Sequence, residues 1–184
     1  GFVAGVKVKE LLEEVQSPHQ NIKMYDTASV GRMLAIDGII QYTDYDHFAY
    51  HEMMVHVPMQ SHPEPKRVLI IGGGDGGCLN EVVKYKSVAE IVHCDVDEAV
   101  GKLTRKHIPE LAPAFEDPRV RSVFQEGASF VNNFKQHFDV IIVDCTDFYG
   151  ASEALARKAF QESAKSALTD DGILVIQGRS VYYD

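Results

Sequence analysis

The stretch KRVLIIGGGDGG, residues 66–77, joins a short apolar run to a glycine-rich turn. The residues that follow it, 78–86, have the apolar spacing of a helix. Gly72, Gly74 and Gly77 match the spacing G-x-G-x-x-G, in which glycines let the backbone approach a ligand at the start of a helix. The order of strand, glycine turn and helix therefore predicts a ligand-binding βα unit.

The same alternation of strand and helix patterns continues toward the end of the chain. Strand-like apolar runs occupy residues 89–95, 120–125, 138–144 and 172–177. Residues 98–111 suit a helix and a loop, and residues 152–168 suit an amphipathic helix with Ser152 as its N-cap. Strands that alternate with helices predict a mainly parallel sheet with helices on both faces, a Rossmann-like α/β fold of the class I methyltransferase type.

Residues 1–46 have a different pattern. Short alternating runs are broken by Gly31 and by the turn signal Asp37–Gly38, which is typical of a small antiparallel β-domain. A helix over roughly 47–57 then leads into the Rossmann-like domain, which we place at residues 47–184. Such domains usually continue after a fifth strand, whereas this chain stops at VYYD, so we expect C-terminal strands to be missing.

Composition and charge restrict the classes of partner. The 184 residues are 45% hydrophobic and carry a net charge of −9, which disfavours nucleic acid and anionic membranes because both need clustered Lys and Arg. The cysteines, Cys78, Cys94 and Cys145, form no C-x-x-C pair, so we expect a reducing, cytoplasmic location. We read no membrane-spanning run and no signal peptide.

Acidic residues follow four of the predicted strands. They are Asp75, Asp95, Asp97, Glu126, Asp144 and Asp147. The carboxyl ends of parallel strands open on one edge of a sheet, so these side chains would share one ligand site. Capping of helix N-termini explains each acid singly, but clustered carboxylates destabilise one another unless a cation compensates them. The pattern therefore predicts a cationic ligand, and Asp75 in the glycine turn disfavours the phosphates of NAD and ATP.

Asp95 adds a second indication of the ligand. It ends the predicted strand that follows the glycine turn, where Rossmann-like folds carry a carboxylate that binds ribose hydroxyls. The alternative is that Asp95 only caps the next helix. Together with the glycine turn, Asp95 predicts a site for an adenosine that carries positive charge.

The histidine spacing does not predict a metal site. His51, Glu52 and His56 form H-E-x-x-x-H, whose second histidine comes one residue later than in the zinc-protease helix. We therefore predict no bound metal, and we expect most of the other histidines to lie on the surface.

Five segments of the chain together resemble the spermidine synthase family, the polyamine aminopropyltransferases. They are LAIDGIIQYT, FAYHEMMVHVP, VLIIGGGDGG, CDVDE and DVIIVDCTD. The resemblance extends from about residue 20 to about residue 178. Plant putrescine N-methyltransferases share this fold, but their glycine turn typically lacks the aspartate, so Asp75 favours aminopropyl transfer.

The resemblance implies that decarboxylated S-adenosylmethionine is the donor, as a co-substrate and without a further cofactor. It implies that Asp75 binds the donor ammonium, that Asp95 binds the ribose, and that Glu126 and Gly127 lie at the adenine. The other donor-binding residues that it implies are Gln20, His51, Gly72, Gly74 and Asp144. The acceptor-binding residues that it implies are Tyr50, Asp147 and Gln177, and the family also implies a homodimer.

The acceptor implied by the family is a diamine, with putrescine as the first choice and spermidine and methylthioadenosine as products. Because a protonated amine is not a nucleophile, Asp147 would take a proton from it, directly or through Tyr50 or water. Three alternatives stay open. They are another acceptor amine (agmatine, cadaverine or spermidine), a methyltransferase that uses ordinary S-adenosylmethionine, and an inactive homologue that binds polyamine or nucleoside.

Three features depart from the pattern of the family. The stretch DCTDFYGASEAL, residues 144–155, lacks the prolines that usually follow the catalytic aspartate. Glu126 stands where an aspartate is usual, and the C-terminal part is absent from this sequence. The first departure concerns acceptor choice, because this loop borders the acceptor site in the family.

Overall fold

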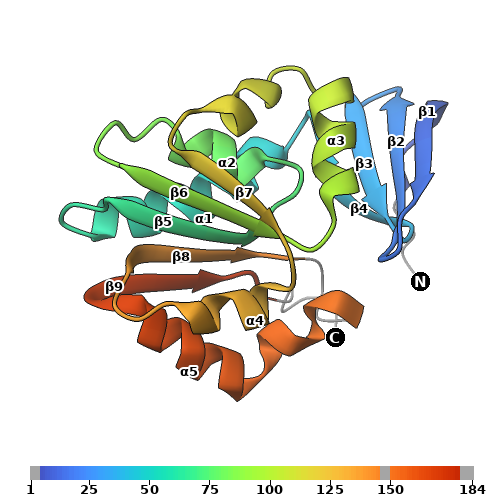
Figure 1. The fold of residues 1–184 in the computed structure, drawn as a ribbon. Helices are drawn as coiled ribbons and strands as arrows, with labels where there is room; N and C mark the ends of the chain where they lie inside the picture. Colours follow the sequence, from blue (N-terminus) through green and yellow to red (C-terminus); the bar gives the residue numbers. More distant parts are fainter. Residues whose placement is uncertain (1–4, 146–149, 179–184) are drawn as a thin grey trace.

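The computed structural model describes residues 5–145 and 150–178, and its strands form two sheets (Figure 1). In chain order the strands are β1 (Val8–Gln16), β2 (Asn21–Thr27), β3 (Arg32–Ile36), β4 (Ile39–Thr43), β5 (Arg67–Gly72), β6 (Glu90–Asp95), β7 (Val120–Phe124), β8 (Phe138–Asp144) and β9 (Leu168–Ile176). The α-helices are α1 (His47–Ser61), α2 (Gly77–Val82), α3 (Glu98–His107), α4 (Gly127–Phe130) and α5 (Lys158–Ala167). Short 3-10 helices cover Ala112–Glu116, Val131–Asn133 and Gly150–Ala156.

The N-terminal sheet is antiparallel, in the strand order β1-β2-β3-β4. The hairpin between β3 and β4 turns at Asp37 and Gly38, whose φ angles of 50° and 82° lie in the left-handed region that such a two-residue turn needs. The Asp37 carboxylate also accepts a hydrogen bond of 2.8 Å from the Asn21 N–H. The predicted antiparallel β-structure at the N-terminus is confirmed, whereas the division between domains after residue 46 stays a prediction.

The second sheet contains β5 to β9, and every neighbouring pair in it is parallel. The strand order is β7-β6-β5-β8-β9, with β5 in the middle. After β5 the chain adds β6 and β7 on one side of it, and then crosses over to add β8 and β9 on the other side. The strand order therefore reverses between β5 and β8. In open sheets of this kind, ligands bind at the carboxyl ends of the strands beside such a point. The predicted Rossmann-like fold is confirmed.

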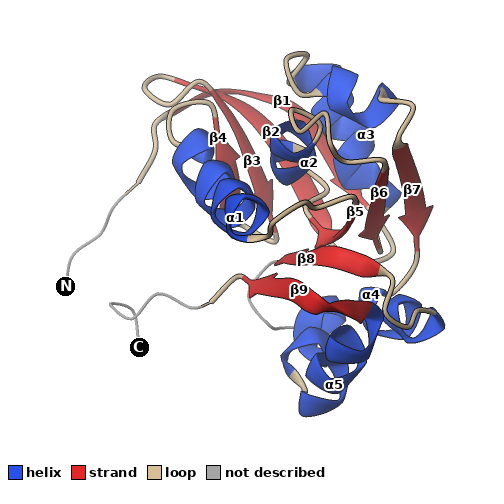
Figure 2. Ribbon diagram, turned by 90° about the vertical axis from the view of Figure 1, so that its left-hand side faces the viewer, coloured by secondary structure: helices blue, strands red, loops and turns tan. Residues whose placement is uncertain are grey.

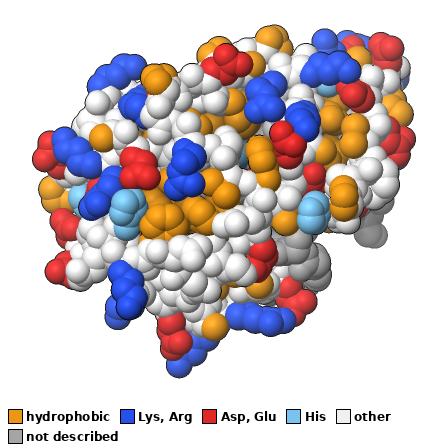
Figure 3. Space-filling model, in the orientation of Figure 1, with side chains coloured by type: hydrophobic (Ala, Val, Ile, Leu, Met, Phe, Trp, Pro, Cys, Tyr) orange, Lys and Arg blue, Asp and Glu red, His pale blue; other side chains and the backbone are white. Residues whose placement is uncertain are grey.

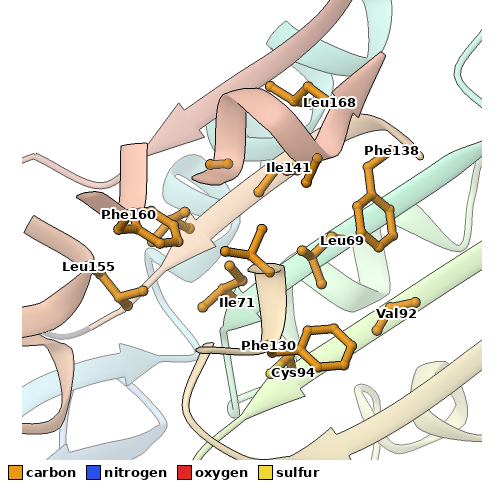
Figure 4. Packing of buried hydrophobic residues seen from close by; sticks show 14 residues of the cluster. Leu69, Ile71, Val92, Cys94, Phe130, Phe138, Ile141, Leu155, Phe160 and Leu168 are labelled. Carbon is orange, nitrogen blue, oxygen red and sulfur yellow. The ribbon is translucent and has the colours of Figure 1, made fainter. Parts of the chain in front are cut away.

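Helices cover both faces of the parallel sheet, with α1 and α2 on one side of β8 and β9 and α4 and α5 on the other (Figure 2). Successive residues of β5 point to opposite faces: Ile70 shares a buried cluster with Leu79 of α2, whereas Leu69 belongs to the cluster of Phe130 and Phe160 on the other face (Figure 4). Burial on both faces explains why the central strands read as continuous apolar runs instead of alternating ones.

Helix α3 connects the two sheets. It lies between the parallel sheet and the N-terminal sheet (Figure 1). Its Val100 and Leu103 pack against Ile22, Met24 and Leu34 of the N-terminal sheet. The N-terminal sheet therefore stands over the carboxyl ends of the parallel strands, where it contributes a wall of the site described below.

The prediction of one helix over residues 152–168 is wrong. A 3-10 segment ends at Ala156, Arg157 is extended with φ −78° and ψ 146°, and α5 begins only at Lys158. Ser152 lies inside the 3-10 segment and does not cap α5. The break lets Leu155 and Phe160 reach the same apolar cluster, whereas residues five apart on one helix point about 140° away from each other.

Three other boundaries differ from those predicted. Helix α1 continues through Pro58 to residue 61, because a proline in the last turn removes only one hydrogen bond of the helix. Helix α2 stops at Val82, and the next residues turn tightly, with the Tyr85 N–H bonded to the Val82 carbonyl at 3.0 Å. Strand β9 begins four residues early, since Leu168 pairs with Phe138 before a bulge.

Arg119 connects the turn after α2 with the start of β7 through hydrogen bonds of its side chain. Its guanidinium donates to the backbone carbonyls of Val83 (2.6 Å), Tyr85 (2.8 Å) and Val88 (3.1 Å). It also binds both carboxylate oxygens of Asp117, at 2.9 and 2.8 Å, which holds the pKa of Asp117 at about 2. One side chain therefore donates to three backbone carbonyls in the segment between α2 and β6.

Replacement of Arg119 by Lys tests this role. The ammonium of Lys cannot reproduce the planar fork, so we expect Arg119→Lys to lower the free energy of unfolding by about 2 kcal/mol. The matched control is Arg157→Lys, because Arg157 makes an exposed ion pair with Glu153 and should contribute less than about 0.5 kcal/mol. Urea denaturation followed by circular dichroism measures both changes. Equal losses in the two variants would contradict the role of Arg119.

Candidate active site

The glycine turn between β5 and α2 lies directly against the end of β8. Gly72 has a φ of 78°, and a Cβ there would lie 2.0 Å from the backbone oxygen of Asp144, so no side chain fits. The Gly73 N–H donates a hydrogen bond of 2.6 Å to the same oxygen. This contact brings Asp75 in the turn and Asp144 at the end of β8 to one edge of the sheet.

A cavity of about 230 Å³ opens at this edge. Most of the predicted site residues line it, namely Gln20, Tyr50, Gly72, Gly74, Asp75, Asp95, Glu126, Gly127, Asp144 and Gln177. His51 does not line this cavity, and the predicted base Asp147 lies outside the described residues. The fold thus gathers residues that are far apart in the sequence, as expected from the ends of parallel strands.

One wall of the cavity is apolar, and the sequence analysis did not identify it. Leu34 and Ile36 of β3 and Ile40 of β4 contribute to it from the N-terminal sheet. Val100 of α3 and Leu155 contribute from the parallel domain. The apolar run of β3 marks Leu34 and Ile36 as buried, but only the packing of one sheet over the other shows that they line a cavity.

Asp75 is held by two groups at the floor of the cavity. Its Oδ1 accepts a hydrogen bond of 2.7 Å from the Gly77 N–H and lies 3.5 Å from Nε2 of His51. Burial alone raises the pKa of a carboxyl, but the His51 imidazole and the Gly77 N–H outweigh it and lower the pKa of Asp75. Asp75 is therefore an ionised group that points a negative charge at the cavity.

His51 lies behind Asp75 and is almost completely buried, with 1% of its surface exposed. Its Nδ1 is 3.3 Å from Nδ1 of His47, one helical turn earlier, and both rings border a second hollow beside Tyr42. An imidazole therefore lies directly behind the acids of the cavity floor. The spacing of His47 and His51 places both on one face of α1, which is a signal that could have revealed the pair.

Of the other histidines, His19 is exposed and His47, His107 and His137 are partly exposed, as expected for most of them, but two are exceptions. His62 and His93 are buried, with 7% and 2% of their surfaces exposed. Nε2 of His93 lies 2.9 Å from the backbone oxygen of Gly72, so this histidine supports the glycine turn from below.

Asp144 faces Asp75 across the cavity floor. Its Oδ1 accepts a hydrogen bond of 2.7 Å from the Tyr50 hydroxyl, which also lies 3.1 Å from Oε1 of Gln177. Burial raises the pKa of Asp144, and the nearby charge of Asp75 raises it further. Burial and the charge of Asp144 in turn raise the pKa of Tyr50. A cation that entered between Asp75 and Asp144 would relieve this repulsion.

Asp95 and Asp97 differ in role although they are two residues apart. Asp95 lines the cavity, and burial is the main cause of its raised pKa. Asp97 instead caps α3 through the Ala99 N–H at 3.0 Å and accepts hydrogen bonds from Ser17 at 2.6 Å and Gln20 at 3.0 Å. The prediction that Asp97 faces the ligand is therefore wrong, because its carboxylate fastens the N-terminal sheet to α3.

Glu126 stands at the start of α4 and borders the cavity together with Gly127. Its carboxylate accepts a hydrogen bond from the hydroxyl of Ser129 in the first turn of the same helix. Glu126 therefore lies at the cavity, as predicted, while its carboxylate is engaged locally by the helix.

Among the described residues, one group combines three side chains that could hold a metal ion. It consists of His51 from α1, Cys78 from α2 and Asp144 from β8, whose ligand atoms lie within 4.8 Å of one another. The H-E-x-x-x-H segment does not act as a unit, because His56 instead pairs with Glu81, Nε2 to Oε2, at 3.0 Å.

Comparison with known proteins agrees with the geometry of the site. Residues 47–184 match the family model of the spermine/spermidine synthase domain, and residues 1–44 match that of the spermidine synthase tetramerisation domain. The chain belongs to the spermine/spermidine synthase family. The resemblance noted in the sequence is thereby confirmed.

Curated members of the spermine/spermidine synthase family match nearly the whole chain. A polyamine aminopropyltransferase of Leptospira biflexa serovar Patoc is 43% identical over 183 residues, which are 100% of this chain and 65% of that protein. One of Clostridium tetani is 43% identical over 178 residues, 96% of this chain and 63% of that protein. The chain thus spans about two thirds of the length of these relatives.

Solved structures of the family share the fold. A crystal structure of spermidine synthase in complex with the transition-state analogue AdoDATO matches with a TM-score of 0.90 and 42% identity, over 92% of this chain and 58% of that chain. The spermidine synthase of Thermotoga maritima matches with a TM-score of 0.87 and 42% identity, over 92% of this chain and 57% of that chain.

In the part of the chain that the structure describes, no helix is long and apolar enough to cross a membrane.

The packing of His51 against the glycine turn of this family member is testable at Gly77. A Cβ on Gly77 would lie 2.1 Å from Cε1 of His51, so Gly77→Ala must displace the buried imidazole. We expect a loss of about 1–3 kcal/mol in the free energy of unfolding.

Gly101→Ala is the matched control for this measurement, because Gly101 lies inside α3 and its nearest neighbour would be 3.5 Å from the new Cβ. Its stability should stay the same or rise by up to about 1 kcal/mol through better helix propensity. If chemical denaturation gives the same result for both variants, His51 is not held as described.

Proposed function

We propose that the protein transfers the aminopropyl group of decarboxylated S-adenosylmethionine to putrescine and forms spermidine and methylthioadenosine. The observation that carries this proposal is the pair of carboxylates, Asp75 and Asp144, that share one cavity beside a glycine turn. Two carboxylates in a buried site repel each other unless a cation lies between them. The donor supplies such a cation in its primary ammonium.

The remaining lining residues support an adenosine moiety in the same cavity. Asp95 stands at the end of β6, where a carboxylate is suited to bind two ribose hydroxyls. Ile36 and Ile40 offer an apolar surface to a flat base, with Glu126 and Gly127 at its edge. The relatives named polyamine aminopropyltransferase and the spermidine synthase that binds AdoDATO support the same class of ligand.

Asp75 also provides selectivity between the two forms of the donor. Ordinary S-adenosylmethionine would bring its own carboxylate to a site that already holds ionised Asp75. An unpaired buried charge costs several kcal/mol, so the decarboxylated donor is favoured.

For the acceptor we propose the region of Tyr50 and Gln177, whose polar side-chain atoms lie 3.1 Å apart at the cavity, together with Asp147. Asp147 follows Asp144 by three residues and is proposed to take a proton from the acceptor amine, directly or through Tyr50 or water. The amine nitrogen then attacks the methylene beside the sulfonium, and methylthioadenosine leaves. The sulfonium is already a good leaving group, so the proposal needs no metal or redox cofactor.

We further propose an oligomer, with a homodimer as the smallest form, in the cytoplasm. The match of residues 1–44 to a tetramerisation domain supports assembly through the N-terminal sheet. On its edge strand β1, the apolar side chains of Val8 and Leu11 are exposed. We do not propose nucleic acid or membranes as partners. On the face drawn in Figure 3, basic side chains are interspersed with acidic ones and do not form a continuous basic patch.

An assay of products tests the proposed reaction. The full-length protein is mixed with putrescine and either decarboxylated or ordinary S-adenosylmethionine, and mass spectrometry detects the products. We expect spermidine and methylthioadenosine from the decarboxylated donor alone. Methylated putrescine from the ordinary donor would identify a methyltransferase. Donor binding without any product would identify an inactive homologue or a different acceptor, which a panel of agmatine, cadaverine and spermidine would reveal.

The role of Asp75 predicts a change in donor preference. In Asp75→Asn the amide oxygen still accepts from the Gly77 N–H, but the charge is lost. We expect the affinity for the decarboxylated donor to fall by about 10- to 100-fold, with a much smaller effect on ordinary S-adenosylmethionine. Asp95→Asn is the matched control, because loss of the ribose contact should weaken both donors alike. Calorimetric titration measures these ratios, and an unchanged ratio in Asp75→Asn would refute the assignment.

The role of Asp147 predicts a separation of binding from turnover. Asp147→Asn should abolish product formation while the dissociation constant of the donor stays nearly the same, since the base acts only on the acceptor. Single-turnover measurements with saturating donor give the rate of the chemical step. A variant that keeps most of its rate would exclude Asp147 as the base.

A further inference from the structure

Three potential metal ligands converge beneath the cavity from three different elements. They are Nε2 or Nδ1 of His51 on α1, Sγ of Cys78 on α2 and a carboxylate oxygen of Asp144 on β8, all within 4.8 Å of one another. The three residues are buried, with exposed fractions of 1%, 0% and 8%. Side chains of this depth and chemistry normally have partners of their own.

Within residues 5–145 and 150–178, two of these side chains each have a buried polar atom without a hydrogen-bond partner. The atoms are Nε2 of His51 and Oδ2 of Asp144. The nearest acid to Nε2, Oδ1 of Asp75, is 3.5 Å away, which is too long for a good hydrogen bond. A buried polar atom without a partner destabilises the protein, so the two atoms together indicate a ligand that would satisfy both.

The other atoms of the same two side chains are already engaged. Nδ1 of His51 faces Nδ1 of His47 at 3.3 Å, and Oδ1 of Asp144 accepts from the Tyr50 hydroxyl at 2.7 Å. Metal-binding histidines and carboxylates typically have such outer partners, which orient the free atom toward the ion. His47 and Tyr50 therefore engage one atom of each side chain, which leaves Nε2 of His51 and Oδ2 of Asp144 as the atoms available to a ligand.

We infer that His51, Cys78 and Asp144 form a binding site for Zn²⁺. A sulfur and a nitrogen ligand favour zinc over Mg²⁺ and Ca²⁺, which prefer oxygen alone. Bonds of about 2.0–2.3 Å to a tetrahedral ion place its ligand atoms about 3.3–3.8 Å apart, so atoms that lie up to 4.8 Å apart must move closer together on binding. The fourth position of a tetrahedral ion would face the cavity, where Asp75 supplies a further negative charge.

Zinc at this point would occupy the floor of the cavity. It would take Asp144 as a ligand and would place two positive charges beside Asp75. The proposed function assigns this region to the ammonium of the donor, so we expect zinc and the donor to exclude each other. This consequence rests on the proposed function, whereas the site itself rests only on the three side chains.

Cobalt is the probe that tests the site without any substrate. The full-length protein, free of affinity tags, is titrated with Co²⁺, which replaces Zn²⁺ and is coloured. We expect one ion per chain, the intense visible bands of a tetrahedral site, and a thiolate-to-cobalt charge-transfer band in the near ultraviolet. Zn²⁺ should remove both signals. Absence of the charge-transfer band at saturating Co²⁺ would overturn the proposal.

Two cysteine variants identify the sulfur ligand. Cys78→Ser should abolish the charge-transfer band, and Cys94→Ser is the matched control because Cys94 is equally buried but lies on β6, outside the group. A band that survives in Cys78→Ser, or disappears in Cys94→Ser, would refute the assignment.

His47→Gln provides an independent test if Cys78→Ser does not fold. It removes the outer partner of His51 without removing a ligand, so the affinity for Co²⁺ should fall by about 10-fold. An unchanged affinity would exclude the orientation of His51 described above.

Competition with the donor is measured last. Decarboxylated S-adenosylmethionine is titrated into the protein with and without one equivalent of Zn²⁺, and we expect the metal to prevent donor binding. Simultaneous binding would refute the exclusion. If the protein binds no donor in the absence of metal, the proposed function fails, and the zinc site is still decided by the cobalt spectra.

Discussion

The site depends on the close approach of the glycine turn to the end of β8. The backbone of Gly72 lies so near the Asp144 carbonyl that a Cβ would overlap it, and the Gly73 N–H bonds to the same oxygen. Because β5 and β8 are neighbours at the point where the sheet reverses its order, this contact brings an acidic turn to an acidic strand end. This geometry causes the repulsion between Asp75 and Asp144, which a bound cation would reduce.

The protein compensates part of this charge itself. His51 lies behind Asp75 and lowers the pKa of Asp75, while burial and the charge of Asp75 raise the pKa of Asp144. The two carboxylates of the cavity floor therefore differ in their readiness to ionise. An ammonium placed between them would have a stable partner in Asp75 and would stabilise the ionised form of Asp144. Buried pairs whose environments separate their pKa values are typical of functional sites.

The N-terminal sheet is part of this arrangement and supplies one wall of the cavity. Asp97 accepts hydrogen bonds from Ser17 and Gln20 while it caps α3, so one carboxylate holds the sheet and the helix together. The apolar contacts of α3 with β2 and β3 add to this connection. As a result, Ile36 and Ile40 face residues of the parallel domain across one cavity, although neither domain alone would enclose a ligand there.

The sequence by itself determined the alternation of strands and helices, the glycine turn and the set of acids at the strand ends. These features are local, because period-two and helical spacing and glycine turns are set by neighbouring residues. Only the tertiary structure decided which acids share the cavity: Asp95 lines it, whereas Asp97, two residues later, turns away. It also decided that residues 152–168 break at Arg157 and that His51 lies beside Asp75. The reason is that both results depend on how distant elements pack together. Local sequence patterns determine neither the direction of a side chain at a strand end nor the contact between α1 and the glycine turn.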